Sequence, residues 1–466
     1  MALFNIQHPS KRIAAITEDE DYFSYKDIND FATSIYHVIQ HRCLVFCLCQ
    51  NTIGSLCGYI SFISHKIVPL MLDSSIDSEL LEGLLNTYKP KYIWLPNSRY
   101  NEFRQRTIIF SKHNYSLVKL EESNFFSLHN DLALLLTTSG STGSPKLVRI
   151  SYGNIEANAK SIAEYLSIDE NERPVTTLPM SYSFGLSIIN SHLLKGATLL
   201  LNSKTLLEKE FWNFIKKQKA TSLSGVPYTY EILKKLRFIK TDLPSLKTLT
   251  QAGGKLNNDL NKEFAEYCKQ SGKRFFVMYG QTEATARMSY LPPQFSLTKL
   301  GSMGIPIPGG EFSLIDEKGS LIDESDIIGE LVYKGKNVSM GYAECGDDLV
   351  KEDGNQGILY TGDLAKRDND HFYYIVGRKK RFIKMYGNRV NLDETERLLK
   401  NIIPDCACAG EDDHMIIYIT DKTRLDEVCQ YISSKTGIHH SAFSIMCLNA
   451  IPKNSSGKTI YSELTF

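Results

Sequence analysis

The chain has 466 residues, of which 42% are hydrophobic and 23% are charged. This composition is typical of globular proteins, and the length is sufficient for two or more domains with substantial cores. Lys and Arg together number 53 and Asp and Glu also number 53, so no excess charge favours nucleic acid or an anionic membrane as a partner. The function must therefore be inferred from local sites.

Ten cysteines occur at irregular spacings, and no two form a Cys-x-x-Cys pair. The first twelve residues lack the apolar core of a secretory leader, so reduced, mostly buried thiols and a cytoplasmic location are predicted. The most apolar stretch, residues 43–72, is interrupted by Gln50, Asn51, His65 and Lys66. It is expected to form a buried strand, a helix and a second strand, not a membrane span.

Segments rich in β-branched and aromatic residues alternate with helical patterns through the first two thirds of the chain. Residues 44–49 precede the helical pattern 53–64, and residues 197–201 precede the helical pattern 206–218. This alternation predicts βαβ units and largely parallel sheets.

The pattern changes from about Gly301, where short strands separated by glycine predict an antiparallel or barrel-like portion. After Gly377 come a basic stretch, a helix predicted over residues 392–402 and two further strands. A small α+β domain is therefore expected, with a boundary near residues 377–380.

The strongest local signal is residues 134–148, LLLTTSGSTGSPKLV. An apolar strand leads into small and hydroxyl residues and then into Lys146. Glycines admit a phosphate close to the backbone, hydroxyls donate hydrogen bonds, and lysine supplies positive charge. Because Pro145 stands where a Walker A motif requires glycine, a kinase-type P-loop is disfavoured. Taken alone, the segment could also be a flexible Ser/Gly loop.

Three further motifs suit a nucleotide. In YGQTEA (residues 279–284) an aromatic ring could stack on a base, a threonine could bond a phosphate, and Glu283 could hold Mg²⁺. YTGDL (residues 360–364) places Asp363 where its carboxylate can accept from two ribose hydroxyls. PKNSSGK (residues 452–458) puts a lysine on a glycine-containing loop. Each motif alone could be an ordinary turn.

In chain order, TSGSTGSPK, YGQTEA, YTGD, GRKKRFIKMYGNRV and PKNSSGK resemble the motif series of the adenylate-forming superfamily. That superfamily contains acyl-CoA synthetases, peptide-synthetase adenylation domains and luciferases. The resemblance implies an α/β fold: a large multi-layer αβ N-terminal domain with a barrel-like subdomain (residues 1–376), a hinge (377–380) and a small mobile α+β C-terminal domain (381–466).

The resemblance also implies site residues. Those matching the family's ATP contacts are Thr138, Ser139, Gly140, Ser141, Thr142, Gly143, Lys146, Gly253, Gly254, Tyr279, Thr282, Asp363 and Arg378. Tyr279 matches the adenine-stacking aromatic, Thr282 the α-phosphate contact and Glu283 the Mg²⁺ ligand. Asp363 and Arg378 match the ribose contacts, while Gly253 and Gly254 match the segment beneath the adenine.

Lys458 matches the catalytic lysine, which bridges the substrate carboxylate and the α-phosphate; Thr282 and Glu283 complete the implied catalytic set. An ammonium there offsets the repulsion between two anions. Lys380 matches the hinge position, and rotation there would bring the thiol tunnel around Gly387 to the site for the second step. The RKKR run at residues 378–381 could otherwise be a surface basic cluster or a localisation signal.

Two positions depart from the family pattern. The glycine after the loop lysine is Leu147, and the arginine three residues after the last lysine is Tyr461. These departures concern loop dynamics and C-terminal anchoring more than adenylation. No carrier domain follows Lys458, so any carrier protein is expected to act in trans.

The predicted acid pocket includes Tyr182, Phe184, Tyr228 and Gln251. Amino-acid-activating relatives carry an aspartate where this chain has Ser183, so an α-amino acid is disfavoured and a small or medium acid is expected. Each aromatic residue could instead serve core packing. For Arg287 two readings stay open: contact with a second polar group of the substrate or a phosphate, or exposure on a helix surface.

The predicted activity is ATP- and Mg²⁺-dependent formation of an acyl adenylate, followed by acyl transfer to a thiol, with CoA or a phosphopantetheine carrier as the acceptor. Neither nucleic acid nor stable membrane insertion is expected. The alternatives are a stand-alone ligase that loads a carrier protein and an amide-forming ligase. A non-catalytic nucleotide-binding module is disfavoured because Lys146, Glu283, Asp363 and Lys458 are all present, and nothing specific supports a luciferase-type oxygenase.

Overall fold

The computed structural model describes residue 9 and residues 11–120, 125–137, 146–385, 388–436, 438–453 and 459–464. The chain divides into two compact units. The first unit comprises Met1–Glu311 and Tyr333–Leu359, and the second unit comprises Phe312–Val332 and Tyr360–Phe466. This division does not coincide with the domain boundary predicted after residue 376, so that boundary and the hinge remain predictions.

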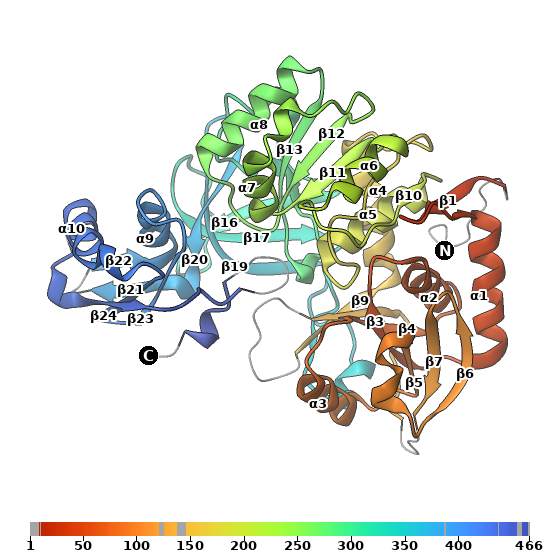
Figure 1. Ribbon diagram of the computed structural model, residues 1–466. Helices are drawn as coiled ribbons and strands as arrows, with labels where there is room; N and C mark the ends of the chain where they lie inside the picture. Colours follow the sequence, from red (N-terminus) through yellow and green to blue (C-terminus); the bar gives the residue numbers. More distant parts are fainter. Residues whose placement is uncertain are drawn as a thin grey trace. The chain divides into compact units, whose positions relative to one another are not determined.

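An eight-stranded mixed sheet forms one core of the first unit (Figure 1). Its strand order is β18 (Tyr342–Ala343), β9 (Leu147–Ser151), β8 (Leu132–Thr137), β4 (Val68–Asp73), β3 (Leu44–Cys49), β5 (Tyr92–Pro96), β7 (Tyr115–Lys119) and β6 (Thr107–Lys112). Strands β8, β4, β3 and β5 are parallel, and every residue of β3 is buried. Such continuous apolar strands require helices on both faces of the sheet.

Helices supply that cover. α2 (Ile53–Ser64) is buried along almost its whole length and packs with α1 (Tyr25–Ile39) on the face to which Val45 and Cys47 point. α3 (Ser78–Tyr88) packs on the face of Phe46 and Leu48. A Cβ at Gly58 would lie 2.2 Å from the Trp94 indole nitrogen, so glycine permits the close approach of α2 to β5. The strand–helix–strand predicted within residues 43–72 is confirmed as β3, α2 and β4.

A second sheet of the first unit precedes two predicted motif segments, Gly253–Gly254 after β12 and YGQTEA at the end of β13. Its order is β11 (Ser222–Gly225), β12 (Thr248–Gln251), β13 (Arg274–Tyr279), β14 (Ser289–Tyr290) and β15 (Ile305–Pro306). β11, β12 and β13 are parallel, and Gln251 pairs with Val277. The segments that follow β12 and β13 therefore begin at the same end of the sheet, where the carboxyl ends of these parallel strands lie.

The other elements of the first unit are helices and one small sheet. The helices are α4 (Tyr152–Tyr165), α5 (Ser183–Leu194), α6 (Lys209–Lys217), α7 (Pro227–Lys235) and α8 (Asn258–Gln270). The small sheet has the order β10 (Leu199–Leu200), β1 (Ile13–Ile16) and β2 (Tyr22–Ser24).

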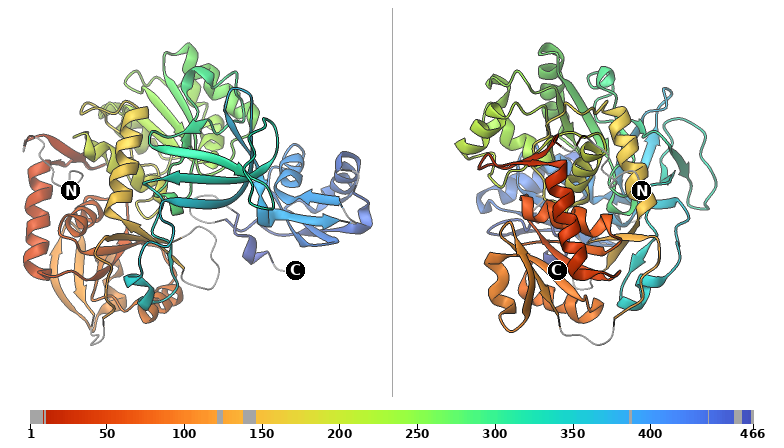
Figure 2. Two further views of the ribbon diagram at one scale, coloured as in Figure 1. Left: turned by 180° about the vertical axis from the view of Figure 1, so that it is seen from behind. Right: turned by 90° about the vertical axis from the view of Figure 1, so that its right-hand side faces the viewer.

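The glycine-punctuated part of the chain after Gly301 contains a further sheet. One sheet has the order β16 (Gly310–Ile315), β17 (Gly329–Gly335), β19 (Ile358–Arg367) and β20 (Tyr373–Arg378), and its long strands are visible in Figure 2. β19 and β20 are antiparallel. The unit boundary falls within β16, β17 and β19.

The rest of the second unit is α+β, as predicted. It contains the pair β21 (Phe382–Met385) and β22 (Asn388–Asn391), the helices α9 (Leu392–Leu399) and α10 (Leu425–Thr436), and the sheet β23 (Cys406–Glu411), β24 (His414–Ile419) and β25 (Phe443–Cys447). Both helices contribute to one apolar core with β23 and β24. The sequence predicted one helix and two strands here, so a second helix and further strands were missed.

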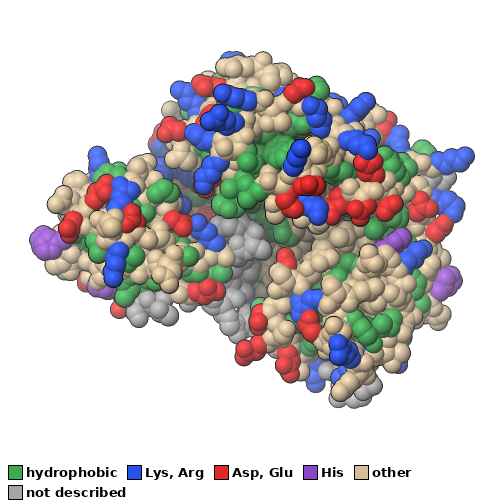
Figure 3. Space-filling view, viewed as in Figure 1, with side chains coloured by type: hydrophobic (Ala, Val, Ile, Leu, Met, Phe, Trp, Pro, Cys, Tyr) green, Lys and Arg blue, Asp and Glu red, His purple; other side chains and the backbone are tan. Residues whose placement is uncertain are grey.

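Surface charge, cysteine burial and helix hydrophobicity can each be compared with the predictions from composition. Lys and Arg side chains are interspersed with Asp and Glu on the face shown in Figure 3, in keeping with the balanced composition. Seven of the ten cysteines are buried, which agrees with the prediction of mostly buried thiols. Among the described residues, no helix is both long enough and apolar enough to cross a membrane.

Candidate active site

Lys146 lies at the start of β9, directly after the predicted phosphate loop. Residues 138–145, which include the predicted contacts Thr138 to Gly143, lie outside the described residues. The Lys146 ammonium is 3.6 Å from the centroid of the Tyr342 ring and 3.7 Å from a carboxylate oxygen of Glu344. Pairing of Tyr342 with Val148 across β18 and β9 brings these side chains together.

Tyr342 also contacts the predicted magnesium ligand. Its hydroxyl donates a 2.7 Å hydrogen bond to Oε1 of Glu283, and the Glu283 carbonyl accepts from the backbone N–H of Ser339 at 2.8 Å. Burial raises the pKa of Tyr342 well above its usual range, and the Glu283 charge adds to the shift. Tyr342 therefore remains a neutral donor, and it joins Lys146 and Glu283 in one cluster. Tyr342 lies outside every motif of the sequence, so its place in this cluster could not be predicted.

Thr282 meets the predicted acid pocket. Its Oγ1 lies 3.2 Å from Oγ of Ser183, the first residue of α5. The rings of Tyr182 and Phe184 are perpendicular, with centroids 6.3 Å apart. Gly253 has a φ of +83°, and a Cβ there would lie 2.7 Å from the Tyr182 hydroxyl, so only glycine fits. The structure thus places the glycine segment against the pocket segment.

The structure also places the three other predicted site residues of the first unit, Tyr279, Gln251 and Tyr228. Tyr279 ends β13, and its hydroxyl accepts from Nε2 of Gln281 at 3.2 Å. Gln251 is 1% exposed; its Nε2 donates to the carbonyl of Gly254 at 2.8 Å, and its Oε1 has no partner among the described residues. Tyr228 on α7 is 51% exposed, so its place in the pocket remains a prediction.

Arg287 is buried, with 2% of its surface exposed. The reading of this residue as a helix-surface arginine is therefore wrong. The backbone of Gly280 approaches that of Ala286 so closely that a Cβ at position 280 would lie 1.6 Å from the Ala286 carbonyl oxygen, so glycine permits this turn. Arg287 follows the turn, and its Nε donates to Ser187 of α5. Sequence spacing could not reveal that burial.

In the second unit, Asp363 and Arg378 lie opposite each other on β19 and β20. Arg378 Nε is 3.5 Å from Oδ1 of Asp363, and Asp363 is 5% exposed. The two predicted ribose contacts are therefore adjacent. Lys380 lies within a single 3₁₀ turn, Lys379–Arg381. Lys458 and Gly387 lie outside the described residues.

Tyr461, which stands where the family carries arginine, belongs to a buried network of the second unit. Its ring centroid is 3.9 Å from the Arg381 guanidinium, and its hydroxyl donates to Glu396 at 2.9 Å. Arg381 also pairs with Asp393 at 2.8 Å and with Glu396 at 2.5 Å. The network links the turn that carries Lys380, the helix α9 and the C-terminal segment.

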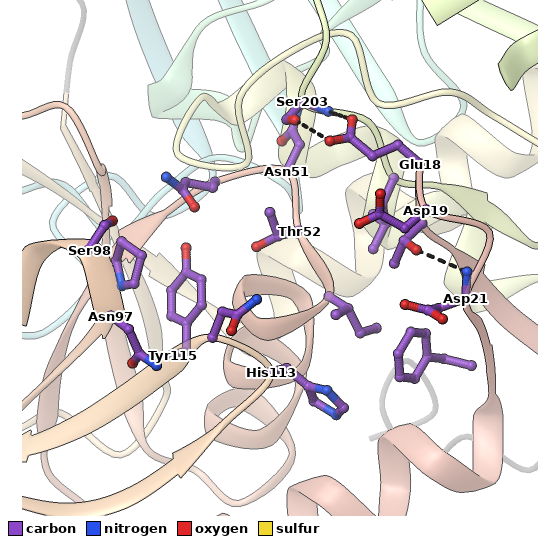
Figure 4. A pocket seen from close by; sticks show the side chains of 17 residues that line it. Glu18, Asp19, Asp21, Asn51, Thr52, Asn97, Ser98, His113, Tyr115 and Ser203 are labelled. Carbon is purple, nitrogen blue, oxygen red and sulfur yellow. Dashed lines mark hydrogen bonds between the residues drawn. The ribbon is translucent and has the colours of Figure 1, made fainter. Parts of the chain in front are cut away.

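A separate cavity of about 490 Å³ lies elsewhere in the first unit (Figure 4). Asn51 and Thr52, which follow β3, line it together with Tyr115, Glu18 and Asp21. None of the predicted site residues that the structure describes is part of its lining. The candidate active site therefore rests on the Lys146–Tyr342–Glu283 cluster and its neighbours, not on this cavity.

Comparison with known proteins identifies the class. A family model described as AMP-binding enzyme matches residues 5–343, and this chain belongs to that family. The 2-succinylbenzoate–CoA ligase of Bacillus subtilis (strain 168) is 27% identical over 346 residues, which cover 71% of this chain and 68% of the ligase. Feruloyl-CoA synthase of Amycolatopsis sp is 27% identical over 351 residues, which cover 72% and 70% of the two chains.

Solved structures give the same fold. O-succinylbenzoate coenzyme A synthetase (MenE) from Bacillus subtilis, in complex with AMP, matches with a TM-score of 0.81 and 22% identity over 100% of this chain and 98% of that chain. ATP-bound MatB from Rhodopseudomonas palustris matches with a TM-score of 0.79 and 18% identity over 99% and 98%. The fold class and the family resemblance predicted from the motifs are confirmed.

Proposed function

We propose that this protein is an ATP-dependent, AMP-forming acid–thiol ligase. It activates a small or medium carboxylic acid as an acyl adenylate, releases pyrophosphate, and transfers the acyl group to CoA. The observation that carries this proposal is the cluster in which Lys146 and Glu283 meet around Tyr342. Family membership and the CoA ligases among the relatives support the same reaction.

The first step forms the adenylate. A carboxylate oxygen of the acid attacks the α-phosphorus of ATP, the bond from that phosphorus to the bridging oxygen breaks, and pyrophosphate leaves. Two anions must meet, so donors and cations fixed in advance lower the barrier. Lys146 would hold the departing phosphates, Oγ1 of Thr282 would donate to the α-phosphate, and Lys458 would bridge the α-phosphate and the acid.

Glu283 has the donor chemistry of a magnesium ligand. Mg²⁺ in such sites takes one or two carboxylates together with substrate phosphates and water. The Tyr342 hydroxyl fixes the Glu283 carboxylate through Oε1. Bound Mg²⁺ would neutralise charge on the phosphate oxygens.

The second step transfers the acyl group. The thiol sulfur attacks the acyl carbonyl carbon, the bond to the phosphate oxygen breaks, AMP leaves and the thiol proton is released to solvent. Asp363 and Arg378 would hold the ribose through both steps. Rotation at Lys380 would withdraw Lys458 and present the segment around Gly387, which lets one site serve two reactions. The ten free cysteines support a cytoplasmic location for this activity.

The test is pyrophosphate release across a panel of short fatty, hydroxy, aryl and amino acids, with and without CoA. Lys458→Ala serves as the blank. Release with one class of acid, followed by thioester formation with CoA, would support the proposal. Release without any thioester would indicate a carrier protein or an amine as the acceptor. No release with any acid would contradict the adenylation step itself.

A further inference from the structure

Arg287 is a buried cation with uncharged surroundings. Its Nε donates to Oγ of Ser187 at 3.2 Å, and its Nη1 donates to the Tyr165 hydroxyl at 3.0 Å and to Sδ of Met278 at 3.2 Å. The Phe184 ring centroid is 4.8 Å from the guanidinium carbon. No Asp or Glu of the described chain forms an ion pair with Arg287, although the residue is only 2% exposed.

The neighbouring titratable groups cannot supply the missing negative charge. Burial lowers the pKa of His192 to about 4, so this imidazole is neutral at physiological pH. Burial also raises the pKa of Tyr165, so its hydroxyl stays protonated. An arginine keeps its proton inside proteins, and a buried charge is ordinarily paired. The arrangement is therefore incomplete without an anion from outside the described chain.

The backbone before Arg287 is held in an unusual conformation. Thr285 has a φ of +56° and Ala286 has a φ of +114°, values that residues with a Cβ adopt only where the surroundings impose them. The Arg287 carbonyl accepts hydrogen bonds from Nδ2 of Asn158 at 3.0 Å and from Nδ2 of Asn337 at 3.1 Å. Side chains from two distant segments thus hold the backbone at Arg287 in place.

Helix α5 connects Arg287 to the reaction centre. Ser183 in its first turn meets Thr282, and Ser187 one turn later meets Arg287. Residues four apart lie on one face of a helix, so both contacts are made on the same side of α5. Phe184, a predicted pocket residue, lies between them in the sequence and against the guanidinium. An anion bound by Arg287 would therefore lie beside the predicted acid pocket.

We propose that Arg287 binds a second, unreactive carboxylate of the acid substrate, so that the enzyme acts on a dicarboxylic acid. The inference rests on the proposed function: one carboxylate is adenylated while the other pairs with the guanidinium. Nε and Nη1 make the hydrogen bonds of Arg287 to described residues, and Nη2 makes none of them. Paired N–H groups of a guanidinium match the geometry of a carboxylate.

The test measures pyrophosphate release with aliphatic dicarboxylic acids and with monocarboxylic acids of equal length. Wild type should prefer a dicarboxylic acid by about 10- to 100-fold in kcat/KM, as expected for hydrogen bonds to a charged group. Arg287→Met should abolish this preference mainly through KM, with little effect on the monocarboxylic acids. Arg287→Lys should retain part of it. Arg173→Met, which alters another arginine of the first unit, is the matched control and should keep the preference.

Two results would overturn the inference: no preference for any dicarboxylic acid in wild type, or an undiminished preference in Arg287→Met. If the methionine variant does not fold, a wild-type enzyme without the preference still overturns the inference, and an undiminished preference in Arg287→Lys would count against Arg287. Should no acid release pyrophosphate, the proposed function fails, and calorimetric binding of the dicarboxylic acids in the presence of AMP tests recognition separately. Binding that Arg287→Met weakens would uphold recognition, and binding of equal strength would refute it.

Discussion

Replacing Tyr342 with phenylalanine should weaken productive binding of MgATP. The substitution removes the 2.7 Å hydrogen bond to Glu283 and leaves the ring 3.6 Å from the Lys146 ammonium. A hydrogen bond to a charged group contributes about 1.5 to 3 kcal/mol. Tyr342 is 38% exposed, so the lower end applies, and kcat/KM for ATP should fall about tenfold. Tyr342→Ala also removes the cation–π contact, which is worth about 0.5 to 1 kcal/mol at an exposed site.

The assay is pyrophosphate release at saturating acid, with ATP varied at several Mg²⁺ concentrations. Tyr342→Phe should need more Mg²⁺ for half-maximal rate, because the Glu283 carboxylate is no longer fixed. Tyr36→Phe is the control, since Tyr36 is an exposed tyrosine stacked on His65 in the same unit. ATP and Mg²⁺ dependence equal to wild type in Tyr342→Phe would refute the argument that this hydroxyl organises the phosphate site.

Three further outcomes are expected. Lys458→Ala should reduce adenylate formation by orders of magnitude while ATP still binds, measured by pyrophosphate release and calorimetry; unimpaired adenylation would exclude its catalytic role. Tyr461→Phe should destabilise the second unit by about 1 to 3 kcal/mol in denaturant unfolding, because Glu396 loses a buried donor, and an unchanged midpoint would contradict that role. Burial lowers the pKa of His192 from 6.5 to about 4, so below pH 6.5 the unfolded chain binds a proton at this imidazole more readily than the folded chain does. The free energy of unfolding should therefore decrease by up to about 3 kcal/mol as the pH falls from 6.5 toward 4, and unfolding midpoints of His192→Gln should depend less on pH over that range than those of wild type.

The local elements and the order of the motifs could be predicted from the sequence. The apolar run of β3 is one unbroken stretch of sequence, and so is the loop before Lys146. The properties of each stretch therefore follow from residues that are neighbours in the chain. The same is true of the YGQTEA turn after β13, where the strand pattern and the polar residues lie side by side in the chain. Such features depend on backbone preference and periodicity, which a single sequence contains.

Contacts between distant segments were decided only by the tertiary structure. Tyr342 reaches Lys146 and Glu283 because β18 pairs with β9 in one register, and a shift of one residue would turn its ring to the other face of the sheet. Arg287 was recognised as a candidate, but its burial depends on the fixed turn before it and on α5 above it. The place of Tyr461 against Arg381 has the same origin. Sequence thus determined which chemical groups are present, and packing between remote segments decided which of them meet.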